Sequence, residues 1–148
     1  MPDVRNVWWL SNTTPVTIKW KDEWYPSVEH FYQAMKSPNK RVRSQIHQMS
    51  WSAAKKFGAG LKRDDWPTVK LKVMEFGLRQ KFSPGSDFAQ KLLDSYPTEL
   101  VEYCEWHDNF WGSCTCKSCG DRGQNHLGKL LMKIRDEYLT GNAQSAIL

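Results

Sequence analysis

The spacing of hydrophobic residues divides the chain into a short β-prone start and a longer helical remainder. Before Pro26, residues 4–10 and 16–20 are rich in β-branched and aromatic side chains, a composition that favours strands. The turn-forming residues 11–15 separate these two stretches. We therefore predict a hairpin or two short strands at the start of the chain.

After Pro26 the apolar residues recur at intervals of three and four. One apolar stripe of a helix is formed by Val28, Phe31, Tyr32 and Met35. Ser27 is a suitable N-cap for this helix, and Pro38 follows its end. Similar patterns predict further helices over residues 40–49, 50–58, 66–82, 86–93 and 125–140.

Two segments of the second half do not follow the helical pattern. Residues 99–106 are strand-like, and residues 107–124 are rich in Gly and Cys with little periodicity. A loop of that length in a small domain is typically functional or held by a metal. The pattern as a whole predicts a single α+β domain over residues 1–148, mostly helical and with a few short strands.

Charge is unevenly distributed along the chain, whose formal net charge is +5. Residues 36–81 contain twelve Lys or Arg and three acids, whereas residues 82–111 contain six acids and one lysine. A basic region beside an acidic one suits a phosphate-bearing ligand held near carboxylates, although a solvated helical surface gives the same pattern. Neither a signal peptide nor an apolar run of about 20 residues is present, so we expect a cytoplasmic protein that does not enter a membrane.

Three stretches combine residue types that can carry chemistry. In WYPSVEHFYQAMK (24–36), helical spacing places Glu29, Gln33 and Lys36 in one row, a carboxylate, an amide and an ammonium group. HDNFWG (107–112) joins a carboxylate and an amide to a large stacking surface, and GQNHLG (123–128) places Asn125 at a helix start, where anions are favoured. Each stretch alone is equally consistent with a capped or packed structural element.

Taken together, these stretches resemble the YbiA/NADAR family. The resemblance rests on LSN (10–12), WYPSVEHFYQAMK (24–36), AAKKFG (53–58), WPTVKLKVMEFGLRQKF (66–82), DNFWG (108–112) and GQNHLGKLLMKIR (123–135), which occur in the family's order. It implies a mostly helical α+β fold and N-glycosidase activity. Family members act either on phosphoribosylamino-pyrimidine intermediates of riboflavin synthesis or on ADP-ribose joined to a base.

The resemblance and the chemistry of the reaction together suggest roles for individual residues. Cleavage of a ribose–base bond passes through an oxocarbenium-like state, which a carboxylate near C1′ stabilises. We assign this task to Glu29 and a general acid or base role to Asp108. The substrate-binding candidates are Asn12, Trp24, His30, Gln33, Lys36, Lys55, Asn109, Trp111, Gly112, Asn125 and Arg135.

Three of the four cysteines lie close together in the loop over residues 107–124. Cys114, Cys116 and Cys119 have a spacing that suits a structural zinc, with Cys104 or His107 as the fourth ligand. His126 is a further candidate for that position, and unliganded thiols are the alternative. The hydrolysis itself requires no cofactor.

A different class of function remains open, in which the chain is a non-catalytic nucleic-acid or nucleotide binder with a zinc site. Such a binder has no need for the row of Glu29, Gln33 and Lys36, so we favour the enzyme. The expected partner is a phosphate-bearing nucleotide or an ADP-ribosylated base, free or in nucleic acid, and a monomer is expected. Removal of ADP-ribose is preferred over cleavage of a pyrimidine intermediate because the basic region suits a diphosphate.

Overall fold

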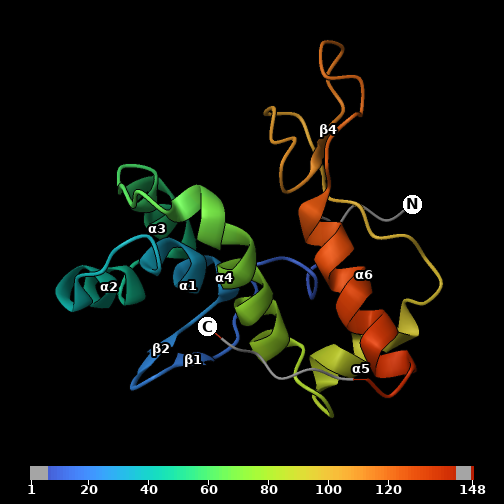
Figure 1. Cartoon of the computed structure of the whole chain (residues 1–148), viewed down its shortest axis with the longest axis horizontal. Helices are drawn as coiled ribbons and strands as arrows, with labels where there is room; N and C mark the ends of the chain where they lie inside the picture. The colour runs from blue at the N-terminus through green and yellow to red at the C-terminus, as the bar shows by residue number, and fades with distance from the viewer. Residues whose placement is uncertain (1–6, 143–147) are drawn as a thin grey trace. The chain divides into compact units, whose positions relative to one another are not determined.

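The structure is a computed structural model that describes residues 7–142 and Leu148. Within these residues the chain divides into two compact units, coloured along the sequence in Figure 1. The Glu29 unit comprises residues 12–81 with Leu148, and the Asp108 unit comprises residues 7–11 and 82–142. Each unit has its own packed interior.

The Glu29 unit begins with a β-hairpin. Strands β1 (Ile18–Trp20) and β2 (Glu23–Tyr25) pair antiparallel, with Ile18 opposite Tyr25. Lys21 in the turn between them takes a left-handed conformation, with a φ of 54°. The side chains of Ile18 and Tyr25 are buried, so one face of the hairpin packs on the helices that follow.

Four helices complete this unit. Their bounds are α1 (Val28–Ala34), α2 (Lys40–His47), α3 (Trp51–Gly58) and α4 (Trp66–Lys81). Ser27, Asn39 and Ser50 cap the first three, each accepting a hydrogen bond from a backbone N–H of the first turn. These caps satisfy amides that would otherwise lack a partner at the helix starts.

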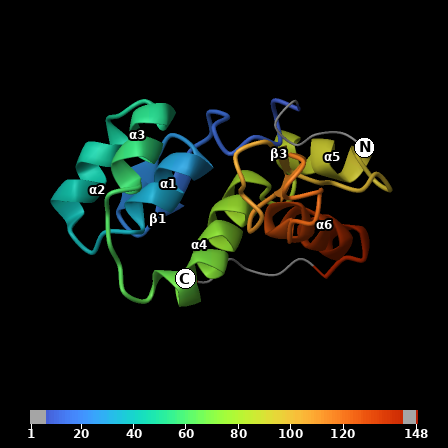
Figure 2. The same ribbon diagram turned by 90° about the horizontal axis from the view of Figure 1, so that it is seen from above.

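Helix α1 is the centre of the Glu29 unit, because it packs against α2, α3 and α4 (Figure 2). Val28 and Phe31 of α1 are fully buried. A Cβ at Gly77 of α4 would lie 3.2 Å from both side chains, so this glycine allows the close approach of α4 to α1. Glu29 therefore stands on the helix that packs against the three other helices of its unit.

The Asp108 unit contains two helices and two short strands. Helix α5 (Asp87–Asp94) packs beside α6 (His126–Leu139), as Figure 1 shows. Strands β3 (Tyr103–Cys104) and β4 (Ser113–Cys114) pair in parallel. Between β3 and α6 the chain makes the long excursion drawn in orange in Figure 1, which contains the Asp108 segment.

The first predicted strand, over residues 4–10, is wrong for its described part. Residues 7–10 form a turn in which the Leu10 N–H donates to the Val7 carbonyl over 2.9 Å, and residues 4–6 lie outside the described range. The strand propensity came largely from two tryptophans whose rings pack edge-on against Phe88 and Phe82. Tertiary packing, rather than a strand partner, determines the local conformation.

The mostly helical α+β class predicted from the sequence is confirmed. All six predicted helices are present within one or two residues of their expected bounds. The strand predicted over residues 99–106 contains only Tyr103 and Cys104, and the first hairpin partner of β1 is β2 rather than an earlier segment. None of the described helices is both long and apolar enough to cross a membrane. The single domain over residues 1–148 stays a prediction.

Candidate active site

Glu29 lies in the first turn of α1, half-buried, and is held at both its backbone and its side chain. Its N–H donates to the carbonyl oxygen of Asn12 over 2.9 Å. Its Oε1 accepts a hydrogen bond from Nε2 of Gln33, one helical turn later, also over 2.9 Å. Oε2 forms no hydrogen bond with a described residue, so one carboxylate oxygen is fixed and the other is available to a ligand.

Gln33 is almost fully buried, with 4% of its surface exposed. Its amide nitrogen binds Glu29, but its Oε1 has no hydrogen-bond partner among the described residues. A Cβ at Gly58 of α3 would overlap with this oxygen. The absence of a side chain at Gly58 therefore gives the Gln33 amide its place beside the carboxylate.

Asn12, whose backbone carbonyl accepts from the Glu29 N–H, has the same property. Its Nδ2 contacts the sulfur of Met74 at 3.5 Å, and its buried Oδ1 has no partner among the described residues. Buried acceptors without a donor are rare in proteins because each costs about 1–3 kcal/mol. Two such acceptors lie on residues that both bind Glu29, so the packing around this carboxylate has an uncompensated cost.

Lys36, the third member of the row, is half-buried over two aromatic rings. Its Nζ lies 5.4 Å from the ring centroid of Tyr32 and 5.7 Å from that of Trp66. Burial lowers the pKa of Lys36, the negative charge of Glu29 opposes this effect, and the positive charge of Lys70 adds to it. Lys36 forms no ion pair with a described residue, so its charge is available to an anionic ligand.

Tyr32 and Trp66 were not among the residues predicted for the site. Their rings pack at 5.0 Å with an interplanar angle of 59°, beneath the Lys36 ammonium. In the sequence, Tyr32 looks like a core residue of the apolar stripe and Trp66 like a helix start. The helical spacing of Tyr32 and Lys36, an aromatic four residues before a cation, was the available signal.

Three other residues of this unit that were predicted for the site have contacts or positions apart from the row of Glu29, Gln33 and Lys36. Both ring nitrogens of His30 are engaged within the protein, with Ser27 Oγ at 2.6 Å and the Met49 carbonyl at 2.8 Å. Trp24 is half-exposed on β2 and packs edge-on against His47 at 4.3 Å. Lys55 is exposed on α3. The contacts of His30 give it a structural task, anchoring α1 to the residues before α3.

In the Asp108 unit, the Asp108 side chain closes a turn. Its Oδ1 accepts from the N–H groups of Phe110 at 3.2 Å and Trp111 at 3.0 Å. Oδ2 forms no hydrogen bond with a described residue. The ring of Trp111 stands perpendicular to that of Phe110, with centroids 4.8 Å apart. Asp108 thus combines an Asx-turn function with one uncommitted oxygen.

Two asparagines of the Asp108 unit that were predicted to bind ligand instead form hydrogen bonds with backbone groups of the protein. Asn109 Oδ1 accepts from the Cys114 N–H over 2.8 Å. Asn125 is buried, accepts from the Glu102 N–H over 3.0 Å and donates to the Leu100 carbonyl over 2.9 Å. These asparagines tie together the segments that carry β3, β4 and the start of α6.

Arg135 and Gly112 also have structural contacts within this unit. Arg135 Nη1 donates to Ser95 Oγ at 3.0 Å and to the Thr98 carbonyl at 2.7 Å, whereas its buried Nε lacks a partner among the described residues. A Cβ at Gly112 would collide with the Glu102 carbonyl. Gly112 is therefore required by the close approach of β4 to β3.

The cysteine-rich loop gathers four side chains that can hold a metal ion. The ligand atoms of His107, Cys114, Cys116 and Cys119 lie within 4.8 Å of one another. Cys104 points elsewhere, since its thiol donates to the Asp108 carbonyl at 3.4 Å. Of the fourth ligands that the sequence left open, the structure brings His107 to the three cysteines.

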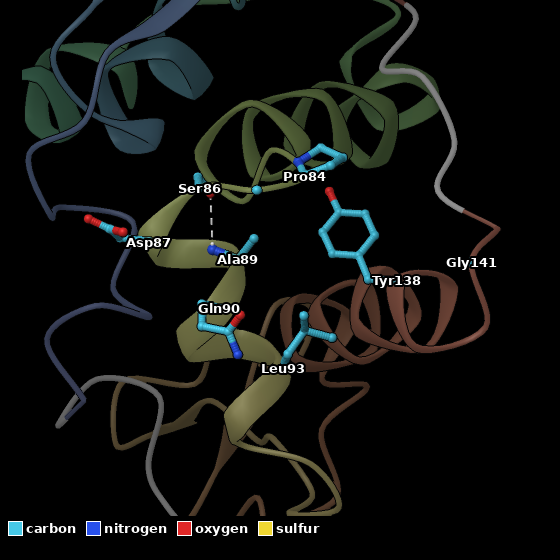
Figure 3. A pocket seen from close by; sticks show the side chains of 9 residues that line it. Pro84, Ser86, Asp87, Ala89, Gln90, Leu93, Tyr138 and Gly141 are labelled. Atoms are coloured by element: carbon cyan, nitrogen blue, oxygen red, sulfur yellow. Dashed lines mark hydrogen bonds between the residues drawn. The ribbon is translucent and has the colours of Figure 1, made fainter.

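One pocket of about 430 Å³ lies in the Asp108 unit between the start of α5 and the end of α6. Figure 3 shows Gln90 and Leu93 of α5 facing Tyr138 of α6 across it. The Tyr138 hydroxyl already donates to the Phe82 carbonyl at 2.6 Å. None of the residues predicted for the site lines this pocket, so it does not bear on the proposed chemistry.

A larger pocket, about 780 Å³, lies in the Glu29 unit and has a cationic wall. Its charged lining residues are Lys21, Arg43, Lys62, Arg63, Asp64, Asp65 and Lys72. Arg43 is paired with Glu23 and Arg63 with Asp65. The three lysines form no ion pair with a described residue, so this wall is suited to a phosphate-bearing ligand.

The chain is similar to known proteins over most of its length. The NADAR domain model matches residues 4–139, which extend across both units. The chain is 33% identical to the N-glycosidase YbiA of Escherichia coli over 132 residues, covering 86% of this chain and 79% of that protein. The NMR structure of E. coli YbiA matches 88% of this chain and 77% of its own, with a TM-score of 0.73 at 33% identity.

A second group of relatives consists of longer proteins. A riboflavin biosynthesis protein of Vibrio vulnificus is 34% identical over 142 residues, which cover 92% of this chain but only 36% of that protein. The chloroplastic riboflavin biosynthesis protein PYRR of Zea mays is 32% identical over 149 residues, 23% of its length. The chain therefore corresponds to one part of these larger proteins.

Proposed function

Because the chain belongs to the NADAR family, we propose that it is an N-glycosidase, a hydrolase that breaks the bond between C1′ of a ribose and a nitrogen of a base. The relatives of similar length carry the name N-glycosidase. The preferred substrate in this proposal is ADP-ribose attached to a guanine-type base, free or in nucleic acid.

The position of Glu29 is the observation that carries the proposal. Cleavage makes C1′ cationic and places negative charge on the departing base. The Gln33 amide holds Oε1 of Glu29, so that Oε2 can face the sugar carbon or orient the attacking water. Preorganised charge of this kind contributes about 3–4 kcal/mol to lowering a barrier. The buried acceptors Asn12 Oδ1 and Gln33 Oε1 would receive hydrogen bonds from ribose hydroxyls.

Cationic residues of the Glu29 unit support a phosphate-bearing substrate. Lys36 lies close enough to Glu29 for their charges to interact, and it would bind a phosphate or the developing negative charge. The pocket wall that carries Lys21, Lys62 and Lys72 adds positive charge in the same unit, which suits a phosphate-bearing substrate.

Asp108 is the second carboxylate in the proposal, as general acid or base at the departing base. Its Oδ1 is committed to the turn, and Oδ2 would exchange the proton. Trp111 would stack on the base. The hydrolysis needs no metal, so a zinc ion at the group of His107 and the three cysteines would have a structural task.

Phosphoribosylamino-pyrimidine intermediates are the second candidate substrate. The names of the Vibrio and maize relatives favour them, since both are called riboflavin biosynthesis proteins. The chain matches only a part of each, so their names describe longer proteins.

A product screen tests the proposal. The protein is incubated separately with ADP-ribosylated guanine nucleotides, ADP-ribosylated DNA and the phosphoribosylamino-pyrimidine, and released base is measured by mass spectrometry. We expect free guanine-type base, lost in Glu29→Gln and retained in the exposed control Glu99→Gln. Release of the pyrimidine alone would establish the second substrate. Release of base by Glu29→Gln at the wild-type rate would refute the role of Glu29.

A further inference from the structure

Between β3 and α6 the chain brings one imidazole and three thiols together, with their ligand atoms within 4.8 Å of one another. His107 Nδ1 lies 3.3 Å from Cys119 Sγ, 3.5 Å from Cys116 Sγ and 3.8 Å from Cys114 Sγ. In a tetrahedral zinc site with Zn–S of about 2.3 Å and Zn–N of about 2.0–2.1 Å, nitrogen and sulfur ligands are separated by about 3.6 Å. The observed separations bracket that value.

The backbone around the cysteines is arranged as a metal-binding turn. The Cys119 N–H points at Cys116 Sγ at 3.4 Å, and the Gly120 N–H donates to the Cys116 carbonyl at 2.8 Å. Gly120 and Asp121 both take positive φ values, 62° and 56°, which turn the chain directly after the last ligand. An N–H directed at sulfur stabilises its thiolate form, the form that binds metal.

From this geometry we propose that His107, Cys114, Cys116 and Cys119 bind one Zn²⁺ ion that fixes the Asp108–Trp111 segment. Four protein ligands fill a tetrahedral shell, so no position is open for substrate and the ion is structural. Binding by three thiols and a neutral imidazole releases three protons and leaves a net charge of −1 on the site. Arg122 lies beside it, donating to the Cys119 carbonyl at 3.0 Å.

The positions of the ligands explain what the ion controls. His107 directly precedes Asp108, and Cys114 is the second residue after Gly112, so two ligands bracket the segment that carries Asp108 and Trp111. His107 has a φ of 66°, a conformation that is unfavourable for a residue with a side chain unless its surroundings stabilise it. Coordination of its imidazole supplies that stabilisation. The connection to catalysis rests on the proposed function, whereas the metal site does not.

Metal analysis of the full chain, purified without a polyhistidine tag, tests the site. We expect one equivalent of zinc, and absorption bands of tetrahedral thiolate coordination after replacement by Co²⁺. Cys119→Ser and His107→Asn should each lose the ion. Asn tolerates positive φ, so His107→Asn removes the imidazole with little backbone strain. Cys104→Ala is the matched control and should retain one equivalent, because the Cys104 thiol donates to the Asp108 carbonyl and is not one of the four ligands.

Hydrogen exchange separates this inference from the proposed function. On removal of zinc by a chelator, the N–H groups of Phe110, Trp111 and Cys114 should exchange at least about tenfold faster, whereas those of α1 remain unchanged. Zinc-free wild-type protein that takes up no zinc would overturn the site. Zinc binding without a change in exchange at these amides would overturn its control of the segment. Neither result depends on the identity of the substrate.

Discussion

Gln33 donates its amide N–H to the Glu29 carboxylate over 2.9 Å while its own carbonyl oxygen is buried without a partner among the described residues. An amide that orients a carboxylate at one end and lacks a partner at the other is expected where a ligand completes the hydrogen bonding. Gln33 therefore connects the packing of α1 to the proposed chemistry. A substitution on the neighbouring helix α3 tests this connection.

Gly58→Ala should disturb the Gln33 amide without touching Glu29. The new Cβ would overlap with Gln33 Oε1, and Gln33 is too buried to move freely. We expect a loss of about 1–3 kcal/mol in the free energy of unfolding, together with reduced turnover. Gly60→Ala is the matched control, since its Cβ would meet its nearest neighbour at 3.6 Å. Urea unfolding of both variants measures the difference, and equal stability of the two would contradict the packing argument.

Lys36→Met should lower kcat/KM by at least about tenfold while leaving the fold intact. The substitution retains the apolar contact with Tyr32 and Trp66 but removes the charge. It also removes a partly desolvated cation, so stability should not fall. Lys56→Met, at an exposed position of α3, is the control for general loss of positive charge. The kcat/KM of both variants is measured by steady-state kinetics on the substrate found by the product screen. An equal loss of kcat/KM in both variants would argue against a specific role of Lys36.

Lys81 gives the protein a pH-dependent stability. Burial lowers the pKa of Lys81 to about 7, whereas the unfolded chain has a lysine pKa near 10.5. Between these values the unfolded state binds more protons than the folded state, so stability rises with pH from about 7 towards 10.5. The gain between pH 7 and pH 9.5 should be about 2–3 kcal/mol smaller in Lys81→Met than in wild type. Chemical unfolding at the two pH values measures it, and identical slopes would show that Lys81 is not desolvated.

Asn125→Ala distinguishes a structural residue from a ligand-binding one. Its side chain bridges the Leu100 carbonyl and the Glu102 N–H, and its backbone has a φ of 51°, which Ala tolerates poorly. The variant should lose about 2–4 kcal/mol of stability, from two unmade hydrogen bonds and backbone strain. Measurements of thermal unfolding and of KM together distinguish the structural role from a ligand-binding role. A large rise in KM at unchanged stability would return Asn125 to the substrate-binding set.

Local signals in the sequence predicted the helices but not the roles of the polar residues. Ser27, Ser50 and Ser86 mark helix starts because a cap is a local interaction, satisfied within three residues. The spacing of Glu29 and Gln33 likewise predicted a contact that the structure contains. Helical periodicity therefore gave the part of the candidate site that lies on a single element.

Contacts between distant segments were beyond the reach of these patterns. Asn125 has the same appearance in sequence whether it binds phosphate or the Leu100 carbonyl, 25 residues away. His30 resembles a free imidazole until Met49 is brought to its ring. The fourth metal ligand was ambiguous for a similar reason. The register of β3 and β4 places Cys104 opposite Cys114, but the Cys104 thiol donates to the Asp108 carbonyl, and it is His107 that lies with the three other cysteines.

The two buried acceptors near Glu29 have a consequence for selectivity between sugars. Asn12 Oδ1 and Gln33 Oε1 are both buried and have no hydrogen-bond donor among the described residues. A sugar whose two vicinal hydroxyls donate hydrogen bonds to these oxygens would give each of them a partner. A 2′-deoxy analogue would leave one oxygen without a partner. Such unmet acceptors allow an enzyme to reject a substrate lacking one hydroxyl far more strongly than shape alone permits. Under the proposed function we therefore expect a 2′-deoxy analogue to be cleaved more slowly than the corresponding ribose substrate.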